Sequence, residues 1–171
     1  MGCATSGVGS NQHVLMEWFA KVAQIKLEHV PYRGAGQAIN DLLAGHVKVA
    51  FLGPTATLPH AQAGKIRLLA QSGDARSPSM PDVPTLQDAG YKGVALESWY
   101  AAFAPLGTPA DIIARLNAEM DKAVKDKTTK DAFLKSATDP VGGTIEDLMK
   151  AARADSEKYG RLVRDLNIKL S

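Results

Sequence analysis

The sequence predicts an α/β fold, in which a mainly parallel sheet is flanked by helices and followed by a mostly helical C-terminal segment. In the first hundred residues, apolar side chains recur at the 3.6-residue spacing of a helix or in short unbroken runs typical of buried strands. The two patterns alternate three times, which favours parallel strands connected by helices. With 171 residues, 45% of them hydrophobic, the chain can bury a substantial core.

The alternating elements of the first part end at residues that interrupt regular structure. Pro31 ends the first predicted strand, and Gly53-Pro54 breaks the second. Gly45 is expected to end the second helix in the left-handed conformation. In chain order, the predicted elements are a helix over 11–24, a strand over 27–32, a helix around 39–43, a strand over 47–52, a short helix up to 63 and a strand over 66–71.

A loop rich in proline and serine, over 73–84, interrupts this alternation. Residues 85–89 are predicted to form one helical turn that stops at Gly90. Residues 94–104 are apolar and predicted to be extended, and the turn-forming run Pro105 to Pro109 closes them.

The remaining chain is predicted to be helical. Thr108 is expected to cap a first helix, with Pro109 at its first position, and a shorter helix is predicted over 127–136. Thr144 is expected to begin a last helix, which reaches about 167, with Asp147 as its capping-box partner. These helices have apolar stripes but no sheet of their own. They must therefore pack onto the first part of the chain or against another chain.

Two glycine-rich turns precede helices and are the strongest functional signal. They are Thr5-Ser6-Gly7-Val8-Gly9-Ser10 and Tyr32-Arg33-Gly34-Ala35-Gly36. The start of a helix leaves backbone N–H groups without partners and carries a partial positive charge, so it can bind a carboxylate or phosphate. Such turns also serve simply as helix caps. The candidate anion-binding residues are Thr5, Ser6, Gly7, Val8, Gly9, Ser10, Gly34, Ala35 and Gly36.

His13 lies in the first helical turn after the first glycine-rich turn, where its ring is expected to face a bound anion or else to pack in the structure. The other histidines are far from it in sequence, and Cys3 is the only cysteine. No metal site, cofactor or catalytic residue is therefore predicted. A small enzyme that uses His13 as an acid or base is an alternative hypothesis.

Composition argues against nucleic acid as a partner. Lysine and arginine number 20 against 18 acidic residues, and aromatic residues make up only 6% of the chain. A nucleic-acid-binding domain normally concentrates positive charge. No apolar run is long enough to span a bilayer.

A series of short motifs resembles the Bug, or TctC-like, family, the solute-binding proteins of tripartite tricarboxylate transporters. The resemblance covers essentially the whole chain. The motifs are Ser6 to Ser10 with His13, His29 to Gly34, Leu42 to Val47, Gly64 to Ala70, Arg76 with Pro81 to Thr85, Gly90, Trp99 to Pro105, and Gly107 to Pro109.

The resemblance implies a two-lobed periplasmic binding protein that closes on a small carboxylate. Residues 1–100 are then expected to form the second lobe, of the periplasmic-binding-protein type II kind. Residues 101–171 are expected to be the helical segment that returns to the first lobe, whose N-terminal part this chain lacks. The Ser6 to Ser10 turn resembles the loop that cradles a ligand carboxylate, and Gly34 to Gly36 the second loop of the cleft. Gly53 and Thr55 stand where the family often has an aspartate.

The resemblance also implies partners and a location. The expected ligand is a dicarboxylate, tricarboxylate or similar organic acid, the expected partners are membrane transporter subunits, and the activity is not enzymatic. The exposed stripes of the C-terminal helices predict a homo-oligomer. An oligomeric interaction or sensory module that has lost its ligand is the alternative. The family location is the periplasm, but the chain shows no signal peptide, and a true start at Met1 would place it in the cytoplasm.

Overall fold

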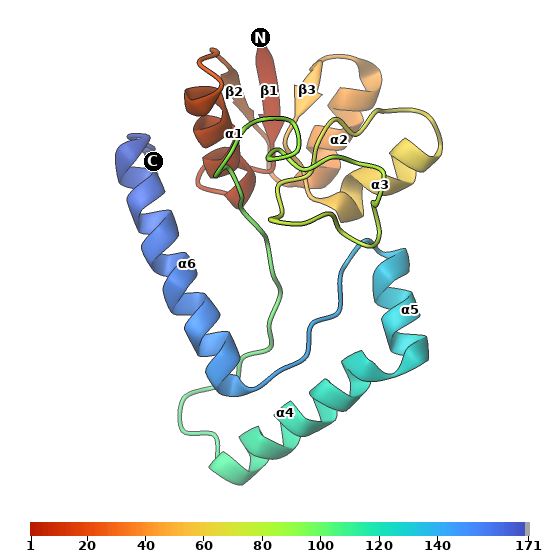
Figure 1. The fold of residues 1–171 in the computed structure, drawn as a ribbon, viewed down its shortest axis with the longest axis vertical. Helices are drawn as coiled ribbons and strands as arrows, with labels where there is room; N and C mark the ends of the chain where they lie inside the picture. The colour runs from red at the N-terminus through yellow and green to blue at the C-terminus, as the bar shows by residue number, and fades with distance from the viewer. Residues whose placement is uncertain (170–171) are drawn as a thin grey trace.

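A three-stranded parallel sheet lies at the centre of the N-terminal part. The computed structural model describes residues 1–169, and its strands are β1 (Gly2–Thr5), β2 (Glu28–Pro31) and β3 (Val49–Ala50). The strand order is β2-β1-β3, and both pairs are parallel, as predicted. Cys3 of β1 pairs with His29 on one side and with Val49 on the other. Figure 1 shows the three strands together at the N-terminal end of the molecule.

The central strand is the one that the sequence pattern did not predict. β1 has only four residues, and Cys3, Ala4 and Thr5 are completely buried. A run this short carries no measurable periodicity, and Gly2, Ala4 and Thr5 are small or polar. Its burial between two strands and under the helices makes it a strand, which is a tertiary effect.

The three helices predicted for this part of the chain form, and each follows a strand. They are α1 (Asn11–Val22), α2 (Ala35–Ala44) and α3 (Pro54–Gln62). Gly45 ends α2 with φ 77°, in the left-handed conformation expected of it. Pro54 is the first residue of α3, where a missing N–H costs nothing.

The predicted strand over 66–71 does not form. In this segment only Gln71 makes a sheet-like contact, an isolated parallel bridge to Thr85. A strand needs a neighbour along its length, and no neighbouring strand runs beside residues 66–70 in the described part of the chain. Residues 85–89 form a turn rather than a helix, and Thr85 and Asp88 bond to each other's backbone N–H at 2.9 and 3.0 Å.

The C-terminal helices form as predicted, with one shifted cap. They are α4 (Ala110–Lys125), α5 (Lys127–Lys135) and α6 (Ile145–Asp165). Thr144 and Asp147 form the expected capping box. Pro109, not Thr108, caps α4, because the Thr108 hydroxyl donates instead to the Pro105 carbonyl at 2.8 Å.

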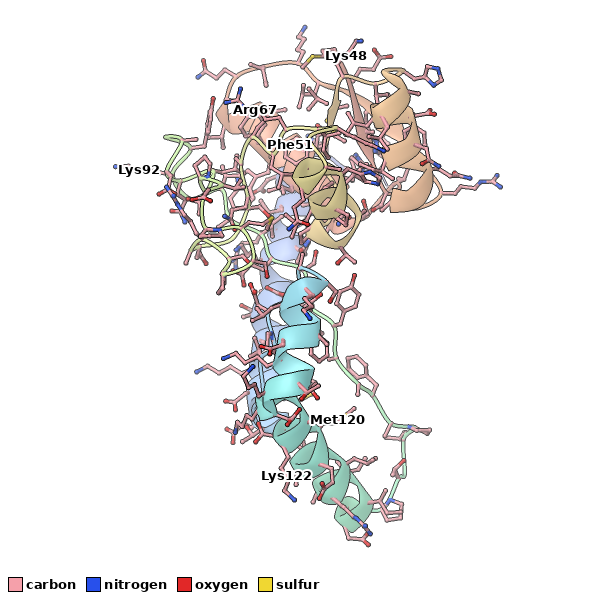
Figure 2. All side chains as sticks on the ribbon, turned by 90° about the vertical axis from the view of Figure 1, so that its right-hand side faces the viewer. Lys48, Phe51, Arg67, Lys92, Met120 and Lys122 are labelled. Carbon is pink, nitrogen blue, oxygen red and sulfur yellow. The ribbon has the colours of Figure 1, made fainter. Side chains whose placement is uncertain are left out.

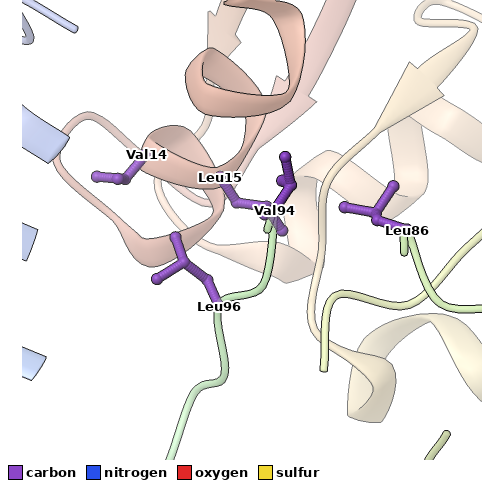
Figure 3. Packing of buried hydrophobic residues seen from close by; sticks show 5 residues of the cluster. All are labelled: Val14, Leu15, Leu86, Val94 and Leu96. Atoms are coloured by element: carbon purple, nitrogen blue, oxygen red, sulfur yellow. The ribbon is translucent and has the colours of Figure 1, made fainter. Parts of the chain in front are cut away.

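The main core lies between α1 and the segment that follows the sheet. Figure 3 shows Val14 and Leu15 of α1 packed with Leu86, Val94 and Leu96. Of the stretch predicted to be extended, 94–104, only residues 94–96 are buried, and none of it is paired as a strand. The C-terminal half of α6 covers the same core through Tyr159, Leu162, Val163 and Leu166. A second cluster, Ala4, Ala38 and Val47, lies between the sheet and α2.

The helices α4, α5 and α6 contain no buried residue. The irregular segment 96–109 leads into α4, and segment 136–144 connects α5 to α6. In Figure 1, α4 lies far from the sheet, whereas the C-terminal end of α6 lies beside α1. Met120, labelled on α4 in Figure 2, is one of several exposed apolar side chains. Among the described helices, none is both long and apolar enough to cross a membrane.

Candidate functional site

The candidate site lies at the carboxyl end of the sheet. Each strand is followed by a short turn and then by a helix, so α1, α2 and α3 all begin at this edge. In Figure 1 the strands run from the N-terminus at the top toward the part of the molecule that contains α4 and α5. Ligands of open parallel sheets commonly bind at the carboxyl ends of the strands.

The two glycine-rich turns lie side by side, because β1 and β2 are neighbours. The Gly34 N–H donates to the Ser6 carbonyl at 3.2 Å, and the Tyr32 N–H donates to the Thr5 carbonyl at 3.1 Å. An added Cβ on Gly7 would lie 3.3 Å from the Tyr32 carbonyl oxygen. The structure thus brings together the two turns that the sequence singled out separately.

The first turn is held by its own polar groups. The Ser10 hydroxyl donates to the Gly7 carbonyl at 2.7 Å and accepts the His13 N–H at 3.2 Å, so Ser10 caps α1. The Gly7 N–H donates to the Thr5 hydroxyl at 3.3 Å. The N–H of Val8, which is exposed, has no acceptor within residues 1–169. Most of the predicted donors therefore hold the turn in shape.

His13 is packed behind this turn rather than on its open side. Its residue is only 7% exposed, and its Nδ1 accepts the Gly9 N–H at 3.1 Å. A nitrogen that accepts a hydrogen bond carries no proton, so the ring is neutral in this arrangement. Burial lowers the pKa of His13 below its ordinary value of 6.5, although the Glu17 carboxylate, 3.8 Å from Nε2, opposes the shift.

His29 of β2 belongs to the same site, and the sequence pattern did not single it out. Its ring stacks on that of His13, with centroids 3.8 Å apart and planes 12° apart. Its Nε2 lies 2.7 Å from the Thr5 hydroxyl. Burial lowers the pKa of His29, and a charge on His13 lowers it further. The sequence feature that could have identified His29 is its position two residues before the end of β2, the strand that neighbours β1 and the first turn.

The second turn leaves the start of α2 open. Gly34 has φ 115° and gives α2 no side-chain cap. The N–H groups of Ala35 and Gly36, the first two residues of α2, have no acceptor in the described part of the chain. These two donors can reach a ligand, since Gly36 is exposed and an added Cβ there would meet nothing within 4 Å.

A third turn, at the start of α3, adjoins the first through Gln12. The Ser6 hydroxyl donates to Gln12 Oε1 at 2.8 Å, and an added Cβ on Gly53 would lie 4.0 Å from Gln12 Nε2. Gly53 is the cap residue of α3, and Thr55 is exposed in its first turn. Gln12, which the sequence pattern did not identify, is therefore bonded to the first turn and lies beside the third.

Two surface hollows lie to the side of these turns. One, of about 530 Å³, lies near the C-terminal ends of α1 and α6 and includes Lys21 and Asp165. The other, of about 370 Å³, includes Asn11, Trp99 and Tyr159 and so borders the start of α1. The turns themselves form an open edge of the sheet. No group of three metal-ligating side chains occurs among the described residues.

Comparison with known proteins identifies relatives along the whole chain. The family described as tripartite tricarboxylate transporter family receptor, TctC, matches residues 1–168. The protein BugT of Bordetella pertussis is 32% identical over 98% of this chain and 51% of its own length. A UPF0065 protein of a Pseudomonas species is 33% identical over 94% of this chain and 48% of its own.

The fold is also that of a solved structure. R. palustris Rpa4515 with adipate superposes with a TM-score of 0.92 and 27% identity, over 98% of this chain and 56% of that one. This chain spans about half the length of these two relatives and of the matched structure. The likeness therefore covers nearly all of this chain and only part of each longer protein.

Proposed function

The chain belongs to the TctC family of tripartite tricarboxylate transporter receptors, and from this membership we propose that it binds a small organic carboxylate at the three adjoining turns. The ligand is bound and released unchanged. The proposed contact residues are Ser6, Gly7, Val8, Gly9, Ser10, Gly34, Ala35, Gly36, Gly53 and Thr55, while the buried Thr5 and His13 hold the first turn from behind.

The observation that carries this proposal is the meeting of helix starts at one edge of the sheet. The Gly34 N–H bond to the Ser6 carbonyl holds the starts of α1 and α2 together, and Gln12 brings the start of α3 beside them. Each helix start contributes partial positive charge, and α2 contributes free N–H donors. A compact carboxylate matches this arrangement, because it accepts several hydrogen bonds and carries the opposite charge.

The matched structure with adipate supports a dicarboxylate as the ligand class. One carboxylate would bind the turns of this chain. In a two-lobed binding protein the second would meet the other lobe, since closure supplies contacts from both sides. We place residues 1–100 in one lobe and residues 101–171 in the helical part of the other.

The remaining proposals concern the whole protein. A receptor of this family would act in the periplasm and deliver its ligand to membrane transporter subunits. The exposed apolar residues of α4 and α6, among them Leu116, Met120 and Met149, favour contact with a second copy of the chain. An oligomeric interaction module without a ligand is the second candidate function, and the same exposed face favours it.

Thermal denaturation with adipate and with citrate tests the proposed function. We expect at least one of them to raise the melting temperature at millimolar concentration, because a ligand that binds only the folded state stabilises it. The variants Ser6→Ala and Gly9→Val should lose most of this shift. Ser136→Ala removes a hydroxyl at the far end of α5 and should keep it. Equal shifts in all four proteins, or no shift with either acid, would contradict carboxylate binding at the turns.

A further inference from the structure

The stacked His13–His29 pair is bonded to both ends of the first glycine-rich turn. His13 accepts the Gly9 N–H at 3.1 Å. His29 contacts the Thr5 hydroxyl at 2.7 Å, and that hydroxyl accepts the Gly7 N–H at 3.3 Å. The two rings face each other at 3.8 Å. A change in the charge of the pair therefore changes the hydrogen bonds that hold a turn with exposed backbone N–H groups.

A proton on His13 Nδ1 changes what this nitrogen can do. Neutral Nδ1 accepts the Gly9 N–H, whereas the protonated nitrogen is itself a donor and must face another acceptor. The Gly9 N–H then loses its partner inside the protein. Gly9 has φ 73° and is exposed, so its amide can be turned toward an anion.

We propose that the His13–His29 pair takes up one proton when a carboxylate binds at the first turn, and that the freed Gly9 N–H then becomes a ligand donor. This inference rests on the proposed function and adds a regulation to it. Binding and protonation promote each other, because a coupling between two ligands is equal in both directions.

The groups around the His13–His29 pair favour one protonated ring and disfavour protonation of both rings. Glu17 of α1 is the acidic side chain nearest His13, with its Oε1 3.8 Å from Nε2, and it stabilises an imidazolium there. Cys3 of β1 pairs in register with His29 and stays an uncharged thiol, because burial raises its pKa to about 11. Glu28, next to His29 in β2, is exposed to solvent. Two stacked imidazolium rings would repel each other strongly.

The coupling predicts tighter binding in acid. In the free protein, burial lowers the pKa of both rings, so the pair is neutral at pH 7. A bound carboxylate beside the Gly9 N–H lies close to His13 and raises the pKa of the pair. Each unit by which the pKa rises makes binding about tenfold tighter below the pKa of the free protein than at pH 8.

The first measurement uses the protein without ligand. NMR titration from pH 8 to pH 4.5 should show the Gly9 amide and the His13 ring changing with the same midpoint, below 6.5. In His13→Gln, the Gln carbonyl can accept the Gly9 N–H but does not titrate, so the Gly9 change should disappear. His60→Gln, which removes a histidine of α3, should leave it unaltered. A Gly9 amide that is unchanged while His13 titrates overturns the proposed coupling.

The second measurement is calorimetry with adipate at pH 6 and pH 8, in two buffers of different ionisation enthalpy. We expect net proton uptake at pH 6 that is absent in His13→Gln and retained in His60→Gln. Adipate itself also exchanges protons at pH 6, and comparing the unsubstituted protein with His13→Gln subtracts this contribution. Adipate binding with no proton uptake assigned to His13 overturns this inference and leaves the proposed function standing. If neither adipate nor citrate binds at either pH, both the proposed function and its linkage to protons are overturned, while the ligand-free titration still reports on Gly9.

Discussion

The backbone N–H of Gly34 donates to the carbonyl of Ser6 at 3.2 Å and thereby joins two turns that are 28 positions apart in the sequence. The bond forms because β1 and β2 are parallel neighbours that end at the same edge of the sheet. It also requires φ 115° at Gly34, which residues with a side chain rarely adopt. Two consecutive βα connections thus become one surface.

Substitution at Gly34 should be destabilising although there is room for a side chain. An added Cβ there meets nothing within 4 Å, so the cost of Gly34→Ala comes from the backbone angle, at roughly 1–2 kcal/mol. Gly36→Ala is the matched control, because Gly36 lies in α2 with equal space and no positive φ. It should be neutral or stabilising by up to about 1 kcal/mol. Urea denaturation distinguishes the two, and equal effects would contradict the backbone explanation.

The buried histidine pair should make the protein less stable in acid. Both pKa values are lowered in the folded state, so the unfolded chain binds more protons between its ordinary value of 6.5 and the lower folded value. Stability therefore falls as the pH drops below about 6.5. Melting temperatures from pH 8 to pH 5 should decline less in His29→Gln than in the unsubstituted protein. His60→Gln is the control, and a decline equal in all three proteins would remove the histidine pair as the cause.

The capping box at Thr144 should stabilise α6 at its exposed N-terminal end. Thr144→Ala removes the hydroxyl that accepts the Asp147 N–H at 3.1 Å and should cost about 1 kcal/mol. Thr128→Ala, at an exposed position in α5, should change stability little. The measurement is again urea denaturation, followed by the helical circular dichroism signal. If the Thr144 variant is as stable as the Thr128 variant, the cap contributes nothing measurable.

The carboxylate of the same box adds a dependence on acid. Hydrogen bonds from Thr144, the backbone bond foremost, lower the pKa of Asp147 below its ordinary value of 3.8. Its stabilising effect is therefore complete above that value and is lost as the pH falls through the lower folded pKa. The difference in the free energy of unfolding between Asp147→Asn and the unsubstituted protein should become smaller below pH 4. A constant difference down to pH 2 would contradict this assignment.

The single cysteine should be unreactive in the folded protein. Cys3 is completely buried in β1, and burial raises the pKa of its thiol to about 11, so little thiolate is present at pH 8. Iodoacetamide should label it slowly in buffer and rapidly in 6 M guanidinium, as mass spectrometry can measure. Rapid labelling of the native protein would show that the central strand opens readily.

The apolar side of α4 should determine the oligomeric state. Ile112, Leu116 and Met120 are exposed at four-residue intervals along one face. Leu116→Lys combined with Met120→Lys should shift the protein toward monomer in sedimentation velocity experiments. Ala118→Lys introduces the same charge on the opposite side of the helix and should leave association unchanged. A protein that is monomeric before substitution would contradict association through α4.

Most helices could be predicted from the local sequence, because their apolar residues recur at helical spacing and several begin or end at a residue that caps or interrupts a helix. Gly45 and the Thr144 cap with Asp147 are such local signals, and the structure has both. The glycine-rich turns were predicted for the same reason. The pairing of strands was not local. Residues 66–71 have the sequence pattern of a strand but no neighbouring strand along most of their length. Gly2 to Thr5 have no recognisable secondary-structure pattern and yet form the central strand of the sheet.

The side chains that meet at the candidate site come from elements far apart in the sequence, so local patterns did not predict their contacts. His13 and His29 are 16 positions apart and have no motif in common, yet the parallel pairing of β1 with β2 and the packing of α1 bring their rings to 3.8 Å. The same packing places Gln12, which is bonded to Ser6 of the first turn, beside Gly53 of the third. A short sequence window specifies backbone geometry, since that depends on neighbouring residues. Contacts between distant residues depend on the order of the strands, β2-β1-β3, which forms only when the whole sheet assembles.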